Sequence, residues 1–95
     1  MIKFEWDTDK ADFNLRKHEV SFEEATTVFY DDFARVIYDP DHSEDEDRFI
    51  IIGMSNTVRL LIVAHCYREN DEVIRIISAR KAEKPEAAQY RRHKL

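Results

Sequence analysis

Four short apolar segments joined by brief polar links constrain the fold of this chain more than any other feature. They occupy residues 34–38, 48–54, 58–67 and 73–81, and they are rich in the β-branched and aromatic residues that favour strands. Consecutive strands with short connections usually lie side by side in one sheet. The segments therefore predict an antiparallel meander, in which the longest connection is an acidic loop at 39–47.

The remaining residues predict one further strand and three helices. Alternating apolar and polar residues at 2–6 are typical of a strand with one buried face. A capped helix is expected over 8–18, and the capping-box sequence Ser21-Phe-Glu-Glu24 starts a second helix over 22–30. With a final helix over 84–93, the order β-α-α-β-β-β-β-α predicts an α+β fold, with helices packed on an antiparallel sheet.

Length and composition predict a single domain over residues 1–95, with enough hydrophobic residues, 43%, for one core. No apolar run approaches the roughly 18 residues of a membrane span, and the N-terminus lacks the apolar centre of a signal peptide. The single cysteine, Cys66, excludes an internal disulfide and suits a reducing compartment. We therefore expect a cytoplasmic protein that does not enter a membrane.

Charge is distributed unevenly along the chain. The net charge of −5 has the wrong sign for a protein that binds nucleic acid by bulk electrostatics. Residues 31–50 hold eight acids and two arginines, a net charge of −6, whereas residues 81–95 hold five lysines and arginines and two glutamates, a net charge of +3. We expect an acidic side that suits a basic segment of a partner protein, and a separate basic side.

The last apolar segment ends in two cations, Arg80 and Lys81, which indicates a site for a phosphate-bearing ligand. A hairpin centred on Asn70 and Asp71 would pair residues whose numbers sum to 141. Arg59 would then lie diagonal to Arg80 on one face of the sheet, within reach of a shared ligand. Two guanidinium groups so placed repel each other unless an anion lies between them. The alternative is that each arginine pairs with a surface acid.

Polar side chains elsewhere supply further candidates, each with a structural alternative. Lys10, Asn14 and Lys17 recur at helical spacing, either as a solvated helix face or as a basic edge of the site. Lys17 and His18 are candidates for an acid–base pair, although a histidine at a helix end also suits the helix dipole. Tyr90, with Arg91, Arg92 and His93, is either part of a catalytic group or simply a docking aromatic on a basic tail.

Metal and cofactor sites are not expected. The acidic loop at 39–47 lacks the glycine and the ligand spacing of a calcium loop, and His42 has no histidine or cysteine partner at zinc spacing. The sequence also lacks a glycine-rich phosphate loop and any cofactor motif. A small-molecule enzyme is for that reason the least supported class of function.

Several motifs resemble one known family along nearly the whole chain. The N-terminal set comprises Phe4-Glu-Trp-Asp7, Lys10, Asn14, Lys17-His18 and Val20-x-Phe22-x-x-Ala25. The later set comprises Asp41-His-Ser43, Glu46, Arg48, Ile52-Gly53 and Ile74-Arg-Ile-Ile-Ser-Ala-Arg-Lys-Ala82. Together they resemble the BrnT-type toxins, which form the toxin half of bacterial type II toxin–antitoxin pairs and are similar to RelE-type ribonucleases in fold.

The resemblance implies metal-independent RNA cleavage that inhibits translation. It also implies neutralisation by a BrnA-like antitoxin whose ribbon-helix-helix domain binds DNA, so that this chain would contact DNA only indirectly. The catalytic candidates are Arg59 and Arg80 for the charge on the phosphorane, with Lys17 and His18 as further catalytic groups. The candidates for contact with RNA are Lys10, Asn14, Lys81 and Tyr90.

Glu19 departs from the family pattern, which usually has glycine after the Lys-His pair. That position is expected to end the helix in a left-handed conformation, which costs glutamate roughly 1 kcal/mol more than glycine. This departure and the acidic total charge support an alternative function. In that alternative, the chain is a non-catalytic module that binds an antitoxin and helps to repress its operon.

Overall fold

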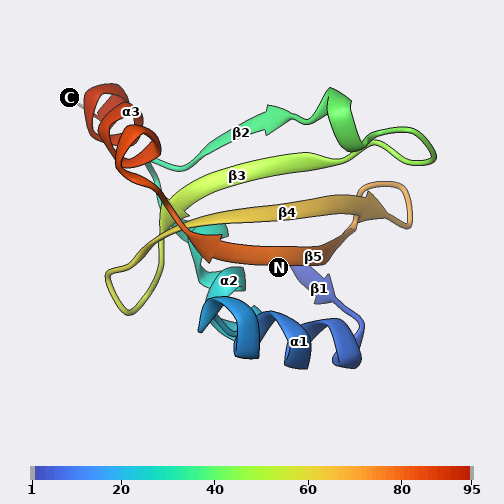
Figure 1. Cartoon of the computed structure of the whole chain (residues 1–95). Coiled ribbons are helices and arrows are strands. Elements are labelled where there is room, and N and C mark those ends of the chain that lie inside the picture. The colour runs from blue at the N-terminus through green and yellow to red at the C-terminus, as the bar shows by residue number, and fades with distance from the viewer. Residues whose placement is uncertain (1, 95) are drawn as a thin grey trace.

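The computed structural model describes residues 2–94. Its strands are β1 (Lys3–Glu5), β2 (Arg35–Tyr38), β3 (Phe49–Met54), β4 (Leu60–Arg68) and β5 (Val73–Lys81). Its helices are α1 (Thr8–His18), α2 (Phe22–Thr27) and α3 (Lys84–Lys94), with 3-10 turns η1 (Val28–Tyr30) and η2 (Pro40–His42). The strands form one sheet in the order β1-β5-β4-β3-β2, and the predicted α+β fold is confirmed (Figure 1).

The predicted meander is confirmed, because β2, β3, β4 and β5 pair in sequence and antiparallel. One pair departs from a wholly antiparallel sheet: β1 lies outside β5 and runs parallel to it. Helices α1 and α2 carry the chain from this edge of the sheet to β2 at the other edge. The expected helix over 22–30 consists of two parts. The α-helix α2 ends at Thr27, and the next three residues form the 3-10 turn η1.

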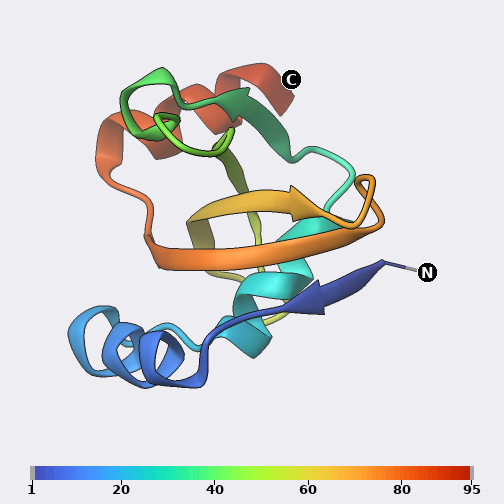
Figure 2. The same cartoon turned by 90° about the vertical axis from the view of Figure 1, so that its right-hand side faces the viewer.

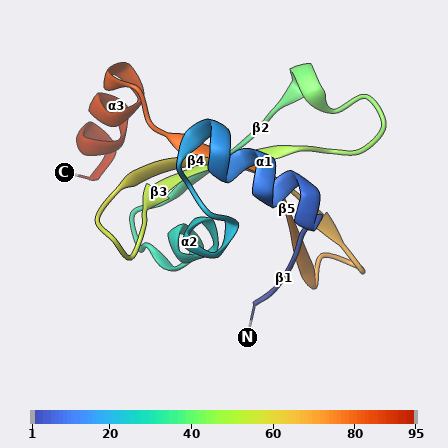
Figure 3. The ribbon, with the colours of Figure 1, turned by 60° about the horizontal axis from the view of Figure 1, so that its bottom comes forward.

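The core lies between the sheet and the pair α1–α2, which cross one face together (Figure 3). Phe22, Val28, Leu61 and Val63 are fully buried there. Helix α3 lies on the opposite side of the sheet, so that the sheet separates it from α1 and α2 (Figure 2). The two faces of the sheet therefore have different surroundings: one face is covered by α1 and α2, and the other carries α3 together with part of the loop at 39–47, which lies near Cys66 and Ile77.

Asn14 joins α1 to β5 from inside the molecule. Its side-chain amide donates to the carbonyl oxygens of Val20 (3.0 Å) and Ala79 (2.8 Å), and its Oδ1 accepts from the Ala79 N–H (3.0 Å). Asn14 is only 4% exposed, whereas its apolar neighbour Leu15 is 48% exposed. The expectation that Asn14 shares a solvent-facing stripe with Lys10 and Lys17 is therefore wrong.

Glu19 ends α1 in the left-handed conformation expected from its position after the Lys-His pair. Its φ and ψ angles are 59° and 32°, and its N–H donates to the Leu15 carbonyl. Among the described residues, its carboxylate makes one long contact, 3.9 Å from the Lys81 ammonium, and both side chains are mostly exposed. The Glu19 carboxylate therefore does little to offset the cost of the backbone conformation.

Replacing Glu19 with glycine is expected to raise the free energy of unfolding by about 1 kcal/mol, because glycine adopts this conformation without steric cost. Urea denaturation measures the change. The control is Glu19→Ala, which removes the carboxylate and keeps a Cβ. Equal stability of the glycine and alanine variants would show that the backbone conformation carries no strain.

Candidate functional site

A bulge in the β4–β5 hairpin separates the two arginines that were expected to act together. Near the turn the register is as predicted, with His65 opposite Ile76. Beyond it the register shifts, because Ile77 is an extra residue in β5 and Arg80 consequently lies opposite Ile62. Since a shift of one residue moves every later side chain to the other face, Arg80 lies on the α3 side of the sheet. The predicted pairing of Arg59 with Arg80 is wrong.

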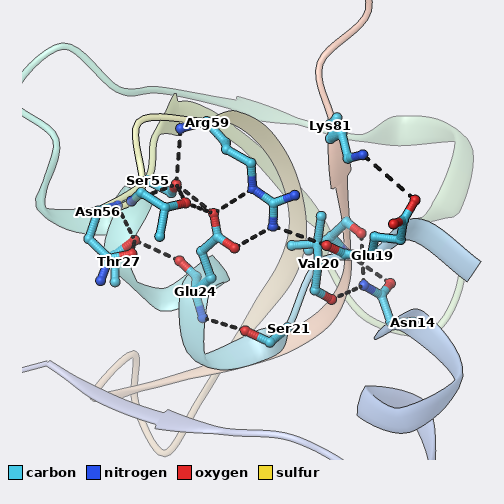
Figure 4. Close-up of polar contacts among 12 residues, drawn as sticks. Asn14, Glu19, Val20, Ser21, Glu24, Thr27, Ser55, Asn56, Arg59 and Lys81 are labelled. Atoms are coloured by element: carbon cyan, nitrogen blue, oxygen red, sulfur yellow. Dashed lines mark hydrogen bonds and ion pairs between the residues drawn. The ribbon is translucent and has the colours of Figure 1, made fainter. Parts of the chain in front are cut away.

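Arg59 lies on the α2 side, where Glu24 binds its guanidinium (Figure 4). Arg59 Nε donates to Glu24 Oε2 at 2.9 Å and Nη2 donates to Oε1, and Nη2 also donates to the Glu19 carbonyl at 3.0 Å. The hydroxyls of Ser55 and Thr57 donate to the same carboxylate at 2.7 and 2.6 Å. These donors, Arg59 foremost, lower the pKa of Glu24 to about 2. We assign Arg59 to the structure of this turn.

Lys17 and His18 lie at the C-terminal end of α1, on the α2 side of the sheet. Lys17 is exposed, with its ammonium 5.8 Å from the centre of the Phe13 ring. His18 is half-buried and directly precedes Glu19, which Lys81 approaches from β5. The exposed Lys10 lies near the start of the same helix, and the three lysines and His18 make up a basic edge that the sheet separates from Arg80. The buried amide of Asn14 is not available for contact with RNA, which corrects that expectation.

Tyr90 anchors α3 to the rest of the molecule. It is 3% exposed, and its hydroxyl donates to Asp31 Oδ2 at 2.6 Å. Burial and the neighbouring Asp31 carboxylate raise the pKa of Tyr90 to about 12. Burial alone would raise the pKa of Asp31, yet hydrogen bonds from the Met54 N–H, Tyr90 and the Phe33 N–H lower it. The structure supports the docking role, and a side chain buried to this extent offers little surface for contact with RNA.

Arg80 lies in a groove of about 670 Å³ between α3 and the open face of the sheet. The cationic and titratable residues that line this groove are Arg35, Arg80, Arg92, His93 and Glu86. The apolar floor comprises Ile37, Ile50, Ile52 and Ile62, and Gln89 and Tyr90 complete the lining. The groove therefore combines three guanidinium groups and one imidazole with an apolar surface.

Glu86 holds the Arg80 side chain in place at the entrance to α3. Arg80 Nη1 and Nη2 donate to its two carboxylate oxygens, each at 2.8 Å, and Nη1 also donates to the Lys81 carbonyl at 3.2 Å. The Glu83 N–H donates to Glu86 Oε1 at 2.7 Å, so the same carboxylate caps the first turn of α3. The hydrogen bonds from Arg80 lower the pKa of Glu86. An anionic ligand would meet Arg80 already paired with a carboxylate.

Among the groove residues, Arg35 was not a sequence-based candidate, and Arg92 and His93 were considered only as neighbours of Tyr90. Arg35 lies two residues before Ile37, and strand alternation places both side chains on the same face. That alternation was the available signal for Arg35. Arg92 and His93 lie in the basic end of α3, where the sequence gives no indication of which cations turn toward the sheet.

Two kinds of site are absent from the described residues. Within residues 2–94, no group of three or more histidine, cysteine, aspartate or glutamate side chains could hold a metal ion. His42 instead pairs with Asp39 at 2.9 Å. None of the described helices is both long and apolar enough to cross a bilayer.

Comparison with known proteins gives a family and a fold. A family described as "Ribonuclease toxin, BrnT, of type II toxin-antitoxin system" matches residues 6–86. Among solved structures, the 1.1 Å crystal structure of the Brucella abortus ribonuclease toxin BrnT matches with a TM-score of 0.67 and 24% sequence identity. The match covers 88% of this chain and 100% of the Brucella chain, and it supports the same fold. No curated protein matches the sequence.

Proposed function

Because the chain belongs to the BrnT family of ribonuclease toxins of type II toxin–antitoxin systems, we propose that it cleaves RNA without a metal ion in the groove beneath α3. One observation carries this placement: Arg35, Arg80, Arg92 and His93 line a single groove with an apolar floor. Cations suit the phosphate backbone, and the isoleucine floor suits the face of a base. The basic edge on the α2 side has cations as well, but none of Lys10, Lys17, His18 and Lys81 lines this groove.

The chemistry requires three things of the groove. The 2′-hydroxyl of the RNA loses a proton and attacks the adjacent phosphorus, the phosphorane gains negative charge, and the 5′-oxygen leaves with a proton. The products are a 2′,3′-cyclic phosphate and a 5′-hydroxyl. Arg80, Arg35 and Arg92 are suited to the charge because guanidinium groups are always protonated and bind two phosphate oxygens at once. His93 is the group in the groove suited to proton transfer, because an imidazole can both accept and donate a proton.

Lys10, Lys17, His18 and Lys81 form a second surface for the RNA strand. Arg80 and Lys81 are consecutive in β5, and their side chains lie on opposite faces of the sheet. An RNA chain that passes the end of β5 therefore meets the groove on one side and the basic edge on the other. We propose that these four cations bind the phosphate backbone and take no part in the chemical step.

The family implies an antitoxin partner. We propose that this partner is a BrnA-like ribbon-helix-helix protein, that the chain reaches DNA only through it, and that unopposed cleavage of RNA inhibits translation in the cytoplasm. The acidic segment at 31–50 supports a basic surface on the partner.

Replacing Arg80 with alanine is expected to lower kcat/KM for RNA cleavage by about 100-fold, the usual effect of removing one preorganised donor to a developing charge. His93→Gln is expected to lower it by about 100-fold or more and to remove the limb of the pH–rate profile due to the imidazole. The assay contains EDTA throughout. Arg75→Ala is the matched control, because Arg75 is on the same strand and pairs with Glu5 at 2.7 Å outside the groove.

The proposal has two separate points of failure. If Arg80→Ala and His93→Gln cleave as fast as Arg75→Ala, the site is not in the groove. If the wild-type chain cleaves RNA only when EDTA is omitted, the reaction is not metal-independent. A folded wild-type chain that never cleaves RNA but binds the antitoxin stably would support the non-catalytic module instead. The pairing of Glu86 with both terminal nitrogens of Arg80 favours that alternative.

A further inference from the structure

Strand β2 is an open edge of the sheet with a defined set of free backbone groups. It pairs with β3 on one side and has no neighbour among the described residues on the other. The Asp39 N–H donates to the Arg48 carbonyl at 2.9 Å, directly beyond the last β2–β3 pair. Hydrogen-bonded and non-hydrogen-bonded pairs alternate along an antiparallel ladder, so the backbone N–H and C=O groups of Ile37 and Arg35 also form hydrogen bonds to β3. The N–H and C=O groups of Val36 and Tyr38 therefore point outward.

Three of the four side chains of β2 are apolar, and they are exposed on both faces of the strand. Val36 and Tyr38 are each 48% exposed, and Ile37 is 56% exposed. Exposed edges of this kind readily pair with another strand, and proteins that avoid such pairing usually protect them with lysine, proline or a covering segment. Here none of the residues of β2 is a lysine or a proline. The strand is suited to pairing.

The loop at 39–47 lies beyond one end of β2 and α3 lies near the other (Figure 1), and these two segments carry opposite net charges. The acidic loop beyond its C-terminal end contains Asp39, Asp41, Glu44, Asp45, Glu46 and Asp47. The basic end of α3 lies near its N-terminal end, where the Lys94 ammonium is 5.0 Å from the centre of the Phe33 ring. Antiparallel pairing of β2 with another β2 would bring each acidic end to a basic end. The edge is therefore complementary in charge to itself.

We propose that β2 pairs antiparallel with β2 of a second copy of this chain, about a twofold axis at Ile37. In this register Val36 lies opposite Tyr38 of the second copy, so that all the outward backbone groups of both strands are bonded. A register shifted by two residues in one direction would place Val36 opposite Pro40, which has no N–H to donate. A register shifted by two residues in the other direction would place Tyr38 opposite residue 34, which lies outside the strand.

The side-chain pairs of this register are favourable as well. Val36 with Tyr38 is a β-branched–aromatic pair, Ile37 meets its own copy, and Arg35 lies opposite Asp39 of the second copy. Arg35 also lines the groove beneath α3. The second copy thus contributes a carboxylate to the rim of the groove, and pairing joins two sheets into one. This inference does not depend on RNA cleavage.

The test is a symmetric cross-link at residue 37. Facing residues on the axis have Cα atoms about 4.5 Å apart, within the range of a disulfide. Ile37→Cys, oxidised with diamide, is expected to form a covalent dimer, since diamide takes up the two electrons and two protons released by the two thiols. Val36→Cys is the matched control, because residue 36 faces residue 38 of the second copy. The native thiol, Cys66, is 1% exposed and contributes little background.

Sedimentation of the wild-type chain over a range of concentrations is expected to show reversible dimerisation. Val36→Pro removes one outward N–H and no bond to β3, so it is expected to remain folded and monomeric, with circular dichroism as the check of folding.

Equal cross-linking of Ile37→Cys and Val36→Cys would overturn the proposed register. A wild-type chain that stays monomeric at all concentrations, while Val36→Pro loses affinity for the antitoxin, would overturn the proposal and assign this edge to the antitoxin.

Discussion

Replacing Asn14 with alanine is expected to lower the free energy of unfolding by about 3–4 kcal/mol, a large share of the stability of a domain this size. The side chain makes three hydrogen bonds, all to backbone atoms of Val20 and Ala79. Both partner residues are almost fully buried, so water does not replace the amide. Alanine leaves one N–H and two carbonyl groups without partners, and each such group costs about 1–3 kcal/mol before relaxation.

Denaturation in urea, followed by circular dichroism, measures this loss. Asp12→Ala is the control, because Asp12 is exposed on the same helix and its loss is expected to change stability by less than about 0.5 kcal/mol. Asn14→Asp is expected to be at least as damaging as alanine, since it places a carboxylate against two carbonyl oxygens. A loss no larger for Asn14→Ala than for Asp12→Ala would mean that the buried amide bonds contribute nothing net.

Replacing Glu24 with glutamine is expected to lower the free energy of unfolding by about 2–3 kcal/mol at neutral pH. The glutamate side chain is 12% exposed and accepts hydrogen bonds from Arg59, Ser55 and Thr57. Glutamine leaves the Arg59 guanidinium without an anion and offers an N–H₂ group where an acceptor is needed. The loss extends to the 55–59 turn, because the Arg59 N–H and the Thr57 N–H both donate to the Ser55 hydroxyl.

The same interaction predicts the pH dependence of this difference. Hydrogen bonds from Arg59 lower the pKa of Glu24 from 4.5 to about 2 in the folded protein. A lowered folded-state pKa contributes stability that is fully present above pH 4.5 and is lost as the pH falls toward 2. Wild type and Glu24→Gln should thus differ most above pH 5 and converge at strongly acidic pH.

Urea denaturation at a series of pH values measures the convergence. Glu5→Gln serves as the control, because the Glu5 side chain is 41% exposed in its pair with Arg75 and a surface pair contributes about 1 kcal/mol or less. A difference between wild type and Glu24→Gln that stays constant down to strongly acidic pH would contradict the assignment.

Local patterns predicted the elements of this fold well. The alternation at 2–6, the apolar segments at 48–54 and 73–81, and the cap at residues 7–8 all correspond to observed strands or to the start of α1. These signals are local, because strand alternation and helix caps depend on a few neighbouring residues. The capping box was only half right: Ser21 Oγ accepts from the Glu24 N–H, but the Glu24 carboxylate turns to Arg59.

The site was predicted less well, because it depends on contacts between distant residues. The assignment of Arg59 and Arg80 to one face assumed a regular hairpin, and no residue near Ile77 identifies it as the extra residue of a bulge. Asn14 has the polarity of a surface residue, and only the approach of Ala79, 65 positions away, explains its burial. Arg92 and His93 join the groove through the docking of α3 by Tyr90 onto Asp31, another long-range contact.

The bulge at Ile77 also affects how residue roles pass between relatives of this chain. A homologue with the same number of residues in β5 but no bulge would keep the motif and the composition of the strand, yet its arginine would lie opposite the residue equivalent to Leu61 and point toward α1 and α2. An alignment without gaps would then equate two arginines on opposite sides of a sheet. In this family, the presence or absence of the bulge is therefore a better guide to equivalence than the arginine itself or its distance along the chain from the hairpin turn.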